Sequence, residues 1–344
     1  MRTKSWKVRT LALLSPDSHS RIMRRIDIHT HIITPAYRKA LARNKNGPRL
    51  EKTKEGYMLW YGNGLKYTVD DRMMSIERKL KDFDEAKVDS QIIAIAMPGM
   101  DSFNDQTLAK RVNDEIAQIV EDYPGKFLGA ASVSLRDVPG AVEELDRATK
   151  DLGLRGVEVF TNVGGKQLDN EEFYPFYEKA ITLDVPILVH PTEPLMAAVM
   201  GEYGLIGMVG YIFETTLATL RLILGGVFDR YPRLKVVVPH MGSTLPYLIS
   251  RIDNQFRINP ESRAKISTLP SEYLKLIYVD TAQSFYKPAI GCALLLLGKD
   301  KILFGTDYPF ANPTYSVESL SKALPESYAA AVFQDNAKSL FKIE

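Results

Sequence analysis

The sequence has almost no cysteine and no long apolar run. Cys292 is the single cysteine among 344 residues, so no disulfide can form within the chain. A lone cysteine is typical of a reducing compartment, and we therefore expect a cytoplasmic location. No apolar run approaches the ~20 residues that a membrane-spanning helix needs. The sequence thus predicts no membrane partner.

The chain also lacks an excess of charge of either sign. Lysine and arginine number 44, and aspartate and glutamate number 42. Such a balance creates no overall field that would attract nucleic acid or an anionic membrane. Apolar residues at 45% and charged residues at 25% are the proportions of an ordinary soluble globular protein.

The first 24 residues are basic and contain one short apolar patch, LALL. This patch is shorter than the apolar segment of a secretory signal, and no small-residue cleavage site follows it. We expect residues 1–24 to be a poorly ordered leader and residues 25–344 to form a single domain.

Short apolar runs alternate with amphipathic segments through the rest of the chain. Runs such as QIIAIAM, VPILVH and LKVVVPH are almost continuously hydrophobic, which is typical of parallel strands buried on both faces. The predicted strands are Ile26–His31, Gln91–Ala96, Phe127–Val133, Arg155–Phe160, Pro186–His190, Leu234–His240, Ile277–Asp280 and Lys301–Thr306. This alternation predicts an α/β fold, a (β/α)8 TIM barrel, with a doubly wound sheet as the competing arrangement.

One segment interrupts the alternation. Residues 48–67 contain Gly-rich turns and alternating aromatic and polar residues, which predict a small β-hairpin insertion after the first strand. The hairpin would rise over the top of the barrel. It could either help to cap a site there or be a variable surface loop.

Four of the five histidines end predicted strands. His29 and His31 end the first strand, His190 ends the fifth and His240 ends the sixth, while Asp307 follows the eighth. In a barrel, the carboxyl ends of all strands meet at the face that holds the active site. The sequence therefore predicts that these five groups converge.

The spacing of His29 and His31 has a physical reason. Alternate residues of a strand face the same way, so both imidazoles can point into the barrel. Three imidazoles and one carboxylate around a divalent ion would suit zinc. Taken singly, each histidine could instead be a structural residue bonded to backbone, and Asp307 could be a turn residue. Their common placement favours a metal site.

Four motifs carry a family resemblance. The segments IDIHTH, VHP, VPHMGSTLPYLISRID and FGTDYPF resemble the signatures of the amidohydrolase superfamily. More narrowly, they resemble its metal-dependent decarboxylase branch, typified by 2-amino-3-carboxymuconate-6-semialdehyde decarboxylase. The resemblance extends from about residue 26 to the C-terminal helices, with the motifs in the expected order.

The resemblance implies a role for each converging group. His29, His31, His190 and Asp307 match the metal ligands of the family. His240 matches the acid–base histidine beside the metal-bound water, and Asp307 is also expected to shuttle a proton.

Substrate contacts are implied more loosely. Arg251, in LPYLISRID, matches an arginine that reaches across a dimer interface to the substrate carboxylate of the neighbouring site. We therefore expect a homodimer or a higher homo-oligomer. The loops MPGMDSF and HPTEP are expected to line the pocket, with Phe103 and Glu193 as candidate substrate contacts. The residues alone would make Arg251 an ordinary helix-surface residue.

The fourth strand indicates how many metal ions the site holds. Many hydrolases of the superfamily place a carboxylated lysine at the end of this strand, where it bridges two metals. Here the strand reads LRGVEVFTNVGG, and Lys166 lies well past its end. We expect one divalent ion, Zn²⁺ in the first instance, with Mn²⁺ as the alternative.

Two reactions are compatible with this site. The branch resemblance implies a non-oxidative decarboxylase, a carbon–carbon lyase acting on a small unsaturated or aromatic carboxylic acid. The alternative is a mononuclear metal-dependent hydrolase, a lactonase or amidohydrolase, because both reactions need a metal and a nearby base. A purely structural metal site is a third possibility, but structural zinc sites are usually closed and rich in thiolates.

One departure from the family concerns the helix after the insertion. The family has a substrate-binding arginine there, whereas SIERKLKDFDEAKV offers Arg78, Lys79 and Lys81 without a clean match. Lysine lacks the bidentate fork of arginine. We expect these three residues to form a solvated helix face.

Overall fold

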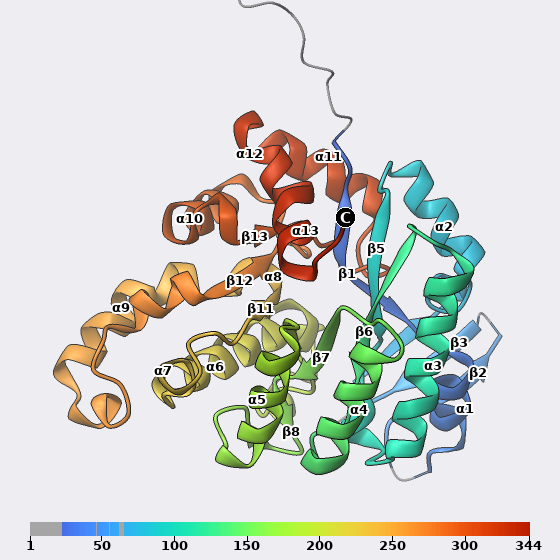
Figure 1. Ribbon diagram of the computed structural model, residues 1–344, viewed down its shortest axis with the longest axis horizontal. Helices are drawn as coiled ribbons and strands as arrows, with labels where there is room; N and C mark the ends of the chain where they lie inside the picture. Colours follow the sequence, from blue (N-terminus) through green and yellow to red (C-terminus); the bar gives the residue numbers. More distant parts are fainter. Residues whose placement is uncertain (1–22, 46, 55, 62–64) are drawn as a thin grey trace, which may run out of the picture.

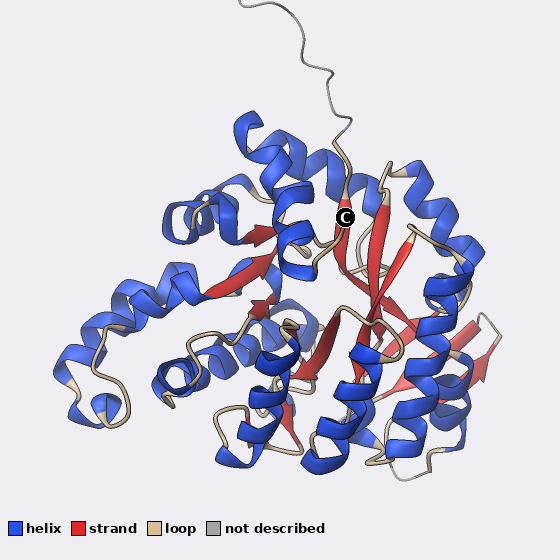
Figure 2. Ribbon diagram, viewed as in Figure 1, coloured by secondary structure: helices blue, strands red, loops and turns tan. Residues whose placement is uncertain are grey.

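Parallel strands form the centre of the computed structural model, which describes residues 23–45, 47–54, 56–61 and 65–344 (Figures 1 and 2). The leader predicted over residues 1–24 lies almost entirely outside the described residues. Every predicted strand is present. The strands of the main sheet follow the order β1 (Ile26–Ile32), β5 (Ser90–Ile95), β6 (Phe127–Ser132), β7 (Gly156–Phe160), β10 (Ile187–His190), β11 (Val236–Val238), β12 (Ile277–Asp280) and β13 (Ile302–Leu303).

The last strand returns to the first and closes the sheet. Beyond β13 the chain runs parallel to β1, with a bridge between Thr30 and Tyr308. The backbone N–H of His31 donates to the carbonyl of Tyr308 at 2.9 Å, and that of Asp307 donates to the carbonyl of His29 at 2.9 Å. An open doubly wound sheet would leave both edges unpaired. The predicted (β/α)8 barrel is confirmed.

Helices surround the barrel, and several of them begin at a polar cap. Asp105 accepts a hydrogen bond from the backbone of Leu108 at 3.0 Å, and Ser75 accepts one from Arg78 at 3.1 Å, which satisfies amides that have no partner inside the helix. The helices are α1 (Pro35–Arg43), α2 (Ile76–Glu85), α3 (Gln106–Asp122), α4 (Val138–Lys150), α5 (Tyr174–Leu183), α6 (Tyr211–Leu224), α7 (Val227–Arg230), α8 (Pro239–Gly242), α9 (Leu245–Ile258), α10 (Lys287–Leu297), α11 (Pro313–Ala323), α12 (Glu326–Ala330) and α13 (Asn336–Phe341).

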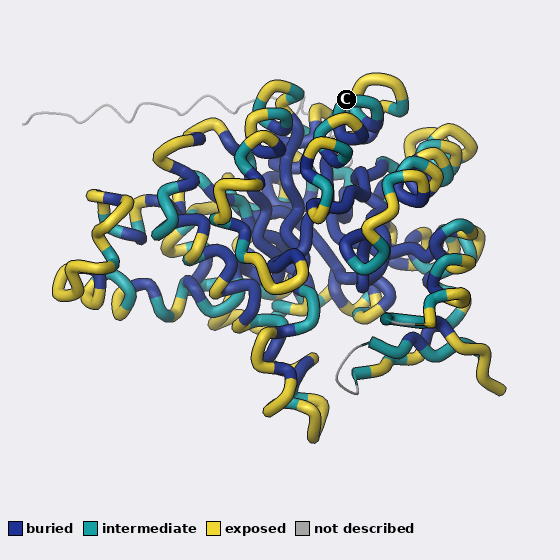
Figure 3. The backbone as a smooth tube through the Cα atoms, turned by 90° about the horizontal axis from the view of Figure 1, so that it is seen from below, coloured by how far each residue is buried: buried dark blue, intermediate teal, exposed yellow. Residues whose placement is uncertain are grey.

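Among the described residues, two apolar clusters hold the fold together. The larger one fills the space between strands and helices, which leaves the strands buried and the outer helix faces exposed (Figure 3). The smaller one lies inside the barrel and includes Ile28, Ala94 and Val237 together with Leu340 and Phe341 of α13. Because Phe341 also approaches Gly156 at the start of β7, α13 plugs the end of the barrel opposite the histidines.

The predicted insertion has one strand more than expected. It is an antiparallel sheet of β2 (Arg49–Thr53), β3 (Gly56–Trp60) and β4 (Lys66–Val69). A further two-stranded sheet of β8 (Asn162–Val163) and β9 (Lys166–Gln167) follows β7. The Tyr61 hydroxyl lies 2.8 Å from the Thr192 hydroxyl, so the insertion contacts the loop after β10. Of the two alternatives for the insertion, this contact favours a cap over the barrel mouth.

The prediction for α2 is wrong for one of its three basic residues. Arg78 and Lys81 are exposed as expected, but Lys79 is only 1% exposed. Its Nζ lies 4.3 Å from the centroid of the Tyr308 ring, and Phe83, one turn along the same helix face, is also buried. The apolar periodicity of α2 therefore turns Lys79 inward, where a cation–π contact replaces water. Burial lowers the pKa of Lys79 to about 7.

One helical stretch among the described residues is apolar over a length that could cross a membrane. It runs from Ile206 through α6 to Leu224, and half of it is buried inside the fold. The other half contributes exposed apolar side chains to the surface. Such a helix is also common in the core of a globular protein.

Candidate metal centre

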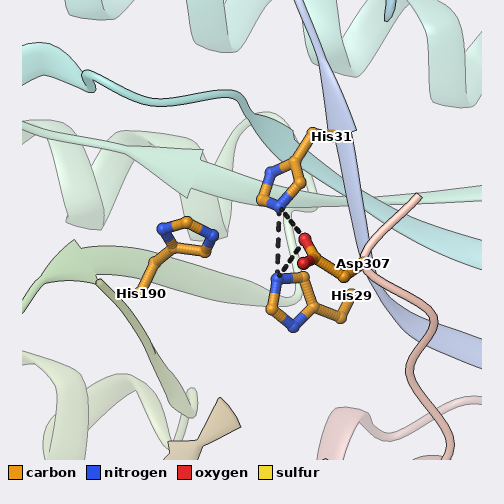
Figure 4. Close-up of side chains that lie close together, drawn as sticks. All are labelled: His29, His31, His190 and Asp307. Atoms are coloured by element: carbon orange, nitrogen blue, oxygen red, sulfur yellow. Dashed lines mark hydrogen bonds and ion pairs between the residues drawn. The ribbon is translucent and has the colours of Figure 1, made fainter. Parts of the chain in front are cut away.

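Three histidines and an aspartate lie together at the carboxyl ends of the strands (Figure 4). One possible ligand atom from each of His29, His31, His190 and Asp307 lies within 4.8 Å of the others. The Nε2 atoms of His29 and His31 are 3.2 Å apart, and Asp307 Oδ1 lies 3.1 Å from Nε2 of His31. All four residues are buried. Their number, spacing and donor types fit one divalent cation.

The far side of each imidazole ring is bonded to an oxygen atom. Nδ1 of His29 lies 2.8 Å from a carboxylate oxygen of Asp280, and Nδ1 of His190 lies 2.7 Å from the carbonyl of Pro191. Nδ1 of His31 lies 3.4 Å from the carbonyl of Ile95. An acceptor at Nδ1 places the ring proton there and leaves the Nε2 lone pair free for a metal ion. The Nδ1 contacts therefore leave the Nε2 atoms of all three histidines available as metal ligands.

The pKa values of these four groups differ from their usual values. Burial lowers the pKa of His31 and holds that of His190 well below its usual range, so both rings are neutral. Burial alone would also lower the pKa of His29, but the charges of Asp280 and Asp307 outweigh it and raise the pKa to about 9. Burial would raise the pKa of Asp307, but contacts with His240 and His31 hold it well below its usual range. Without metal, the site contains an imidazolium beside a carboxylate.

Two buried aspartates that support the site were not among the predicted residues. Asp280 ends β12 and accepts bonds from the backbone of His240 at 2.9 Å and of Ala282 at 3.0 Å, besides its contact with His29. Asp27 accepts from the backbone of His29 at 3.0 Å and from the Thr306 hydroxyl at 2.6 Å. Asp280 ends a predicted strand, and Asp27 lies two residues before His29 in β1. These positions were the available signal in the sequence.

His240 lies beside the ligand cluster but outside it. Its Nε2 is 3.7 Å from Oδ2 of Asp307, whereas its Nδ1 is buried without a hydrogen-bond partner. Its backbone is left-handed, with φ of 56°, as are those of Met241, Ser243 and Asp307. Such conformations are uncommon for residues other than glycine and tend to cluster at functional sites. The turn after β11 thus aims an imidazole at the carboxylate.

A buried glutamate lies under the cluster. Glu158 of β7 is 4% exposed, and its Oε2 has no hydrogen-bond partner. It lines a cavity of about 20 Å³ together with His29, His190 and Asp280. Burial raises the pKa of Glu158 to about 8, so its carboxyl group is mostly protonated at neutral pH.

The predicted substrate contacts are dispersed. Glu193 lines a cleft of about 810 Å³ with Phe160, whose ring centroid lies 5.7 Å from that of His190. Phe103 packs on Tyr37 at 5.9 Å between ring centroids and is not part of the cleft lining. Arg251 is exposed on α9. Only Glu193 of these three lies along the cleft beside the cluster, and the substrate roles of all three remain predictions.

Aromatic rings that the sequence did not point to cover one side of the cluster. The Phe310 ring centroid lies 6.0 Å from that of His31 and 5.5 Å from that of Tyr67 in β4. The Tyr67 hydroxyl donates to the carbonyl of Met97 at 3.0 Å. The insertion therefore adds an apolar wall to the site.

Comparisons with known proteins agree with this geometry. The model of the amidohydrolase family matches residues 26–343. The chain is 31% identical over 306 residues to 2-amino-3-carboxymuconate-6-semialdehyde decarboxylase of Dictyostelium discoideum, covering 83% of this chain and 82% of that protein. It is 30% identical over 295 residues to gamma-resorcylate decarboxylase of Polaromonas sp. strain JS666, covering 79% and 89%.

A solved structure supports the same assignment. Dihydroxybenzoic acid decarboxylase from Polaromonas sp. JS666, with bound manganese and the inhibitor 2-nitroresorcinol, matches with a TM-score of 0.79 at 26% identity. The match covers 93% of this chain and 97% of that one. Together with the four motifs and the family match over nearly the whole described chain, these findings show that the chain belongs to the amidohydrolase family.

Proposed function

We propose that this protein is a metal-dependent, non-oxidative decarboxylase of small aromatic or unsaturated carboxylic acids. The observation that carries the proposal is the four-ligand cluster with a separate imidazole, His240, whose Nε2 lies 3.7 Å from Oδ2 of the ligand Asp307. The relatives named above, which match four-fifths of the chain, are decarboxylases. Phe160 lines a cleft of about 810 Å³ and also packs against the His190 ring, at 5.7 Å between ring centroids, which supports an approach for a small acid from that side.

The reaction exchanges a carboxyl group for a proton. A divalent ion held by the cluster would polarise the oxygens of the substrate. As the bond between the carboxylate carbon and the ring or alkene carbon breaks, CO₂ leaves and its electron pair passes to the ring or alkene. His240 Nε2 delivers the proton that this carbon receives and regains one from water, an acid–base role that suits a positioned imidazole.

The other residues orient the substrate and exclude water. Phe310 and Phe160 flank the imidazole ligands on two sides and provide flat apolar surfaces suited to an unsaturated substrate. The contact between Tyr61 and Thr192 holds the insertion against the mouth of the barrel. Glu193 is the one predicted substrate contact that lines the cleft.

Trapping of CO₂ tests the proposed reaction. The purified, metal-loaded protein is incubated with 2,6-dihydroxybenzoate, 6-methylsalicylate and a carboxymuconate-type acid, and both CO₂ and organic product are measured. Release of CO₂ in equal amount to the decarboxylated product would support the proposal. The alternative, a lactonase or amidohydrolase, would instead give a stoichiometric acid from lactone or amide substrates without CO₂.

Zn²⁺ is the resident ion that we propose, with one ion per chain. Three imidazole nitrogens and one carboxylate oxygen suit zinc, whereas manganese is present in the Polaromonas structure. Elemental analysis of protein purified without added metal measures both the identity and the number of ions. Two ions per chain would contradict a mononuclear site.

A homodimer with Arg251 acting in trans is the assembly that we propose. In Figure 1, α9 projects away from the barrel body, and it carries both Arg251 and Tyr247, which is 86% exposed. Exposed apolar side chains continue onto the neighbouring stretch before and within α6, at Met208, Phe213 and Leu217. An apolar surface of this kind is typical of an interface between subunits.

The dimer has its own test. Arg251→Ala and His240→Ala proteins are each expected to be inactive, and mixing them under conditions of subunit exchange should restore activity in hybrid dimers. Failure to recover activity despite hybrid formation would contradict a role in trans.

Cytoplasmic localisation, which we propose from the single cysteine, can be checked by fractionating cells.

A further inference from the structure

The two carboxylate oxygens of Asp307 face different groups. Oδ1 lies 3.1 Å from Nε2 of His31 and 3.4 Å from Nε2 of His29, on the side of the metal ligands. Oδ2 faces Nε2 of His240 and also accepts a hydrogen bond from the side-chain amide of Gln283. Gln283 has no part in the roles assigned so far.

The loop after β12 fixes the position of Gln283. The backbone N–H of Ala282, next to it, donates to Asp280 at 3.0 Å, and the Thr281 hydroxyl donates to the carbonyl of Gly305 at 3.0 Å. Gln283 itself has a left-handed backbone with φ of 50°. Asp280 also holds the His29 ring. One carboxylate therefore ties a metal-facing imidazole to the loop that presents Gln283.

The amide of Gln283 reaches inward from the rim of the site. The residue as a whole is exposed, whereas its acceptor Asp307 is 5% exposed. An amide nitrogen can only donate, and it cannot act as a ligand for a cation through its N–H groups. A donor on Oδ2 occupies that oxygen and leaves Oδ1 as the oxygen that points at the imidazoles.

We propose that Gln283 is a positioning residue that engages Oδ2 of Asp307 and so presents this carboxylate to the metal through one oxygen. The inference rests on the metal site of the proposed function but not on the identity of the substrate. Residues that orient a metal ligand through a hydrogen bond commonly change metal affinity by 10- to 100-fold when they are removed. The same bond keeps Oδ2 in place opposite His240.

Metal binding by Gln283→Leu protein is the direct test. Leucine has a similar volume but no donor, and Gln283→Ala provides a second variant in case leucine disturbs the loop. The dissociation constant for Mn²⁺ is measured by competition with a chelating dye, and the visible spectrum of the Co²⁺-loaded protein reports the coordination geometry. Urea unfolding in EDTA verifies that each variant is folded.

The control is Gln118→Leu. Gln118 also donates its amide to a carboxylate, that of Asp122 at 2.9 Å, but on the exposed surface of α3. We expect about 10-fold or greater weakening of Mn²⁺ binding and an altered Co²⁺ spectrum in both Gln283 variants, and neither change in the control.

Three results would overturn the inference. They are Mn²⁺ affinity within twofold of the wild type in both folded variants, a rise in substrate KM without a change in metal binding, and absence of metal binding by the wild type. The protein could also bind metal in a way that depends on Gln283 and yet release no CO₂. That result would support the role of Gln283 and contradict the proposed decarboxylase reaction.

Discussion

Replacing Glu158 with glutamine should change how the stability of the metal-free protein depends on pH. The glutamate is buried, and the pKa of its carboxyl group is raised from 4.5 to about 8 by burial. Below pH 4.5 the group is protonated in both the folded and the unfolded chain. Between pH 4.5 and 8 the unfolded chain releases the proton while the folded chain retains it, so the wild type loses stability as the pH rises.

The magnitude follows from the size of the shift. Each pKa unit corresponds to 1.36 kcal/mol, so a shift of about 3.5 units corresponds to about 5 kcal/mol over the whole window. About 3–4 kcal/mol of this falls between pH 5 and pH 8. Glutamine has nearly the same shape but does not titrate, and any constant cost of burying its amide is the same at every pH.

Urea unfolding in EDTA at several pH values measures the effect. Other buried groups also titrate in this window, among them Asp27, whose pKa burial raises to about 7. Their contributions cancel in the difference between the Glu158→Gln variant and the wild type, because the two groups whose charges act on Glu158, His29 and Asp307, keep their folded-state charges from pH 5 to pH 8. We expect the variant to gain about 3–4 kcal/mol relative to the wild type from pH 5 to pH 8.

An exposed glutamate supplies the control for this measurement. Glu121 lies on the exposed surface of α3, and Glu121→Gln measured over the same pH range shows what loss of a surface carboxylate alone does to the stability difference. A difference for Glu158→Gln that changes by less than about 1 kcal/mol would refute the reasoning. It would mean that Glu158 has access to water or to a partner inside the barrel.

Three further predictions separate the ligands from their surroundings. Asp280→Asn should weaken metal binding by roughly 10- to 100-fold, measured by chelator competition, because the His29 ring loses its carboxylate partner; unchanged affinity would contradict this role. His240→Ala should keep the metal, measured by elemental analysis, but abolish turnover; loss of the ion would make His240 a ligand. Phe341→Ala should lower the free energy of unfolding by about 3–5 kcal/mol in urea, because it empties a buried site in the plug of the barrel, and should leave metal affinity in the refolded protein unchanged.

The barrel and the metal cluster could be predicted because both depend on periodic patterns. Parallel strands buried on two faces read as short apolar runs, and the carboxyl end of each run marks one face of the barrel. His29, His31, His190 and Asp307 all follow from that rule, and the structure places their ligand atoms together. The wrong prediction for Lys79 shows that residue type alone does not decide exposure, because the apolar periodicity of α2 places this charged side chain inside the fold.

The supporting contacts could not be predicted because they depend on atomic positions. Asp280 ends a predicted strand, but only the structure shows that its two oxygens serve a ring and two backbone amides. Gln283 lies in an irregular loop with a left-handed backbone, for which the local sequence gives no glycine signal. The third strand of the insertion depends on pairing between β3 and β4, which composition alone left undetermined.

The seam between the first and last strands has a consequence for biosynthesis. His31 and Asp307, which meet at 3.1 Å, are 276 positions apart in the sequence. A nascent chain that still lacks the final sixth of its length offers the imidazoles without the carboxylate, inside a barrel that cannot yet close. The complete cation site therefore arises only near the end of translation, and a chain that terminates early cannot form it.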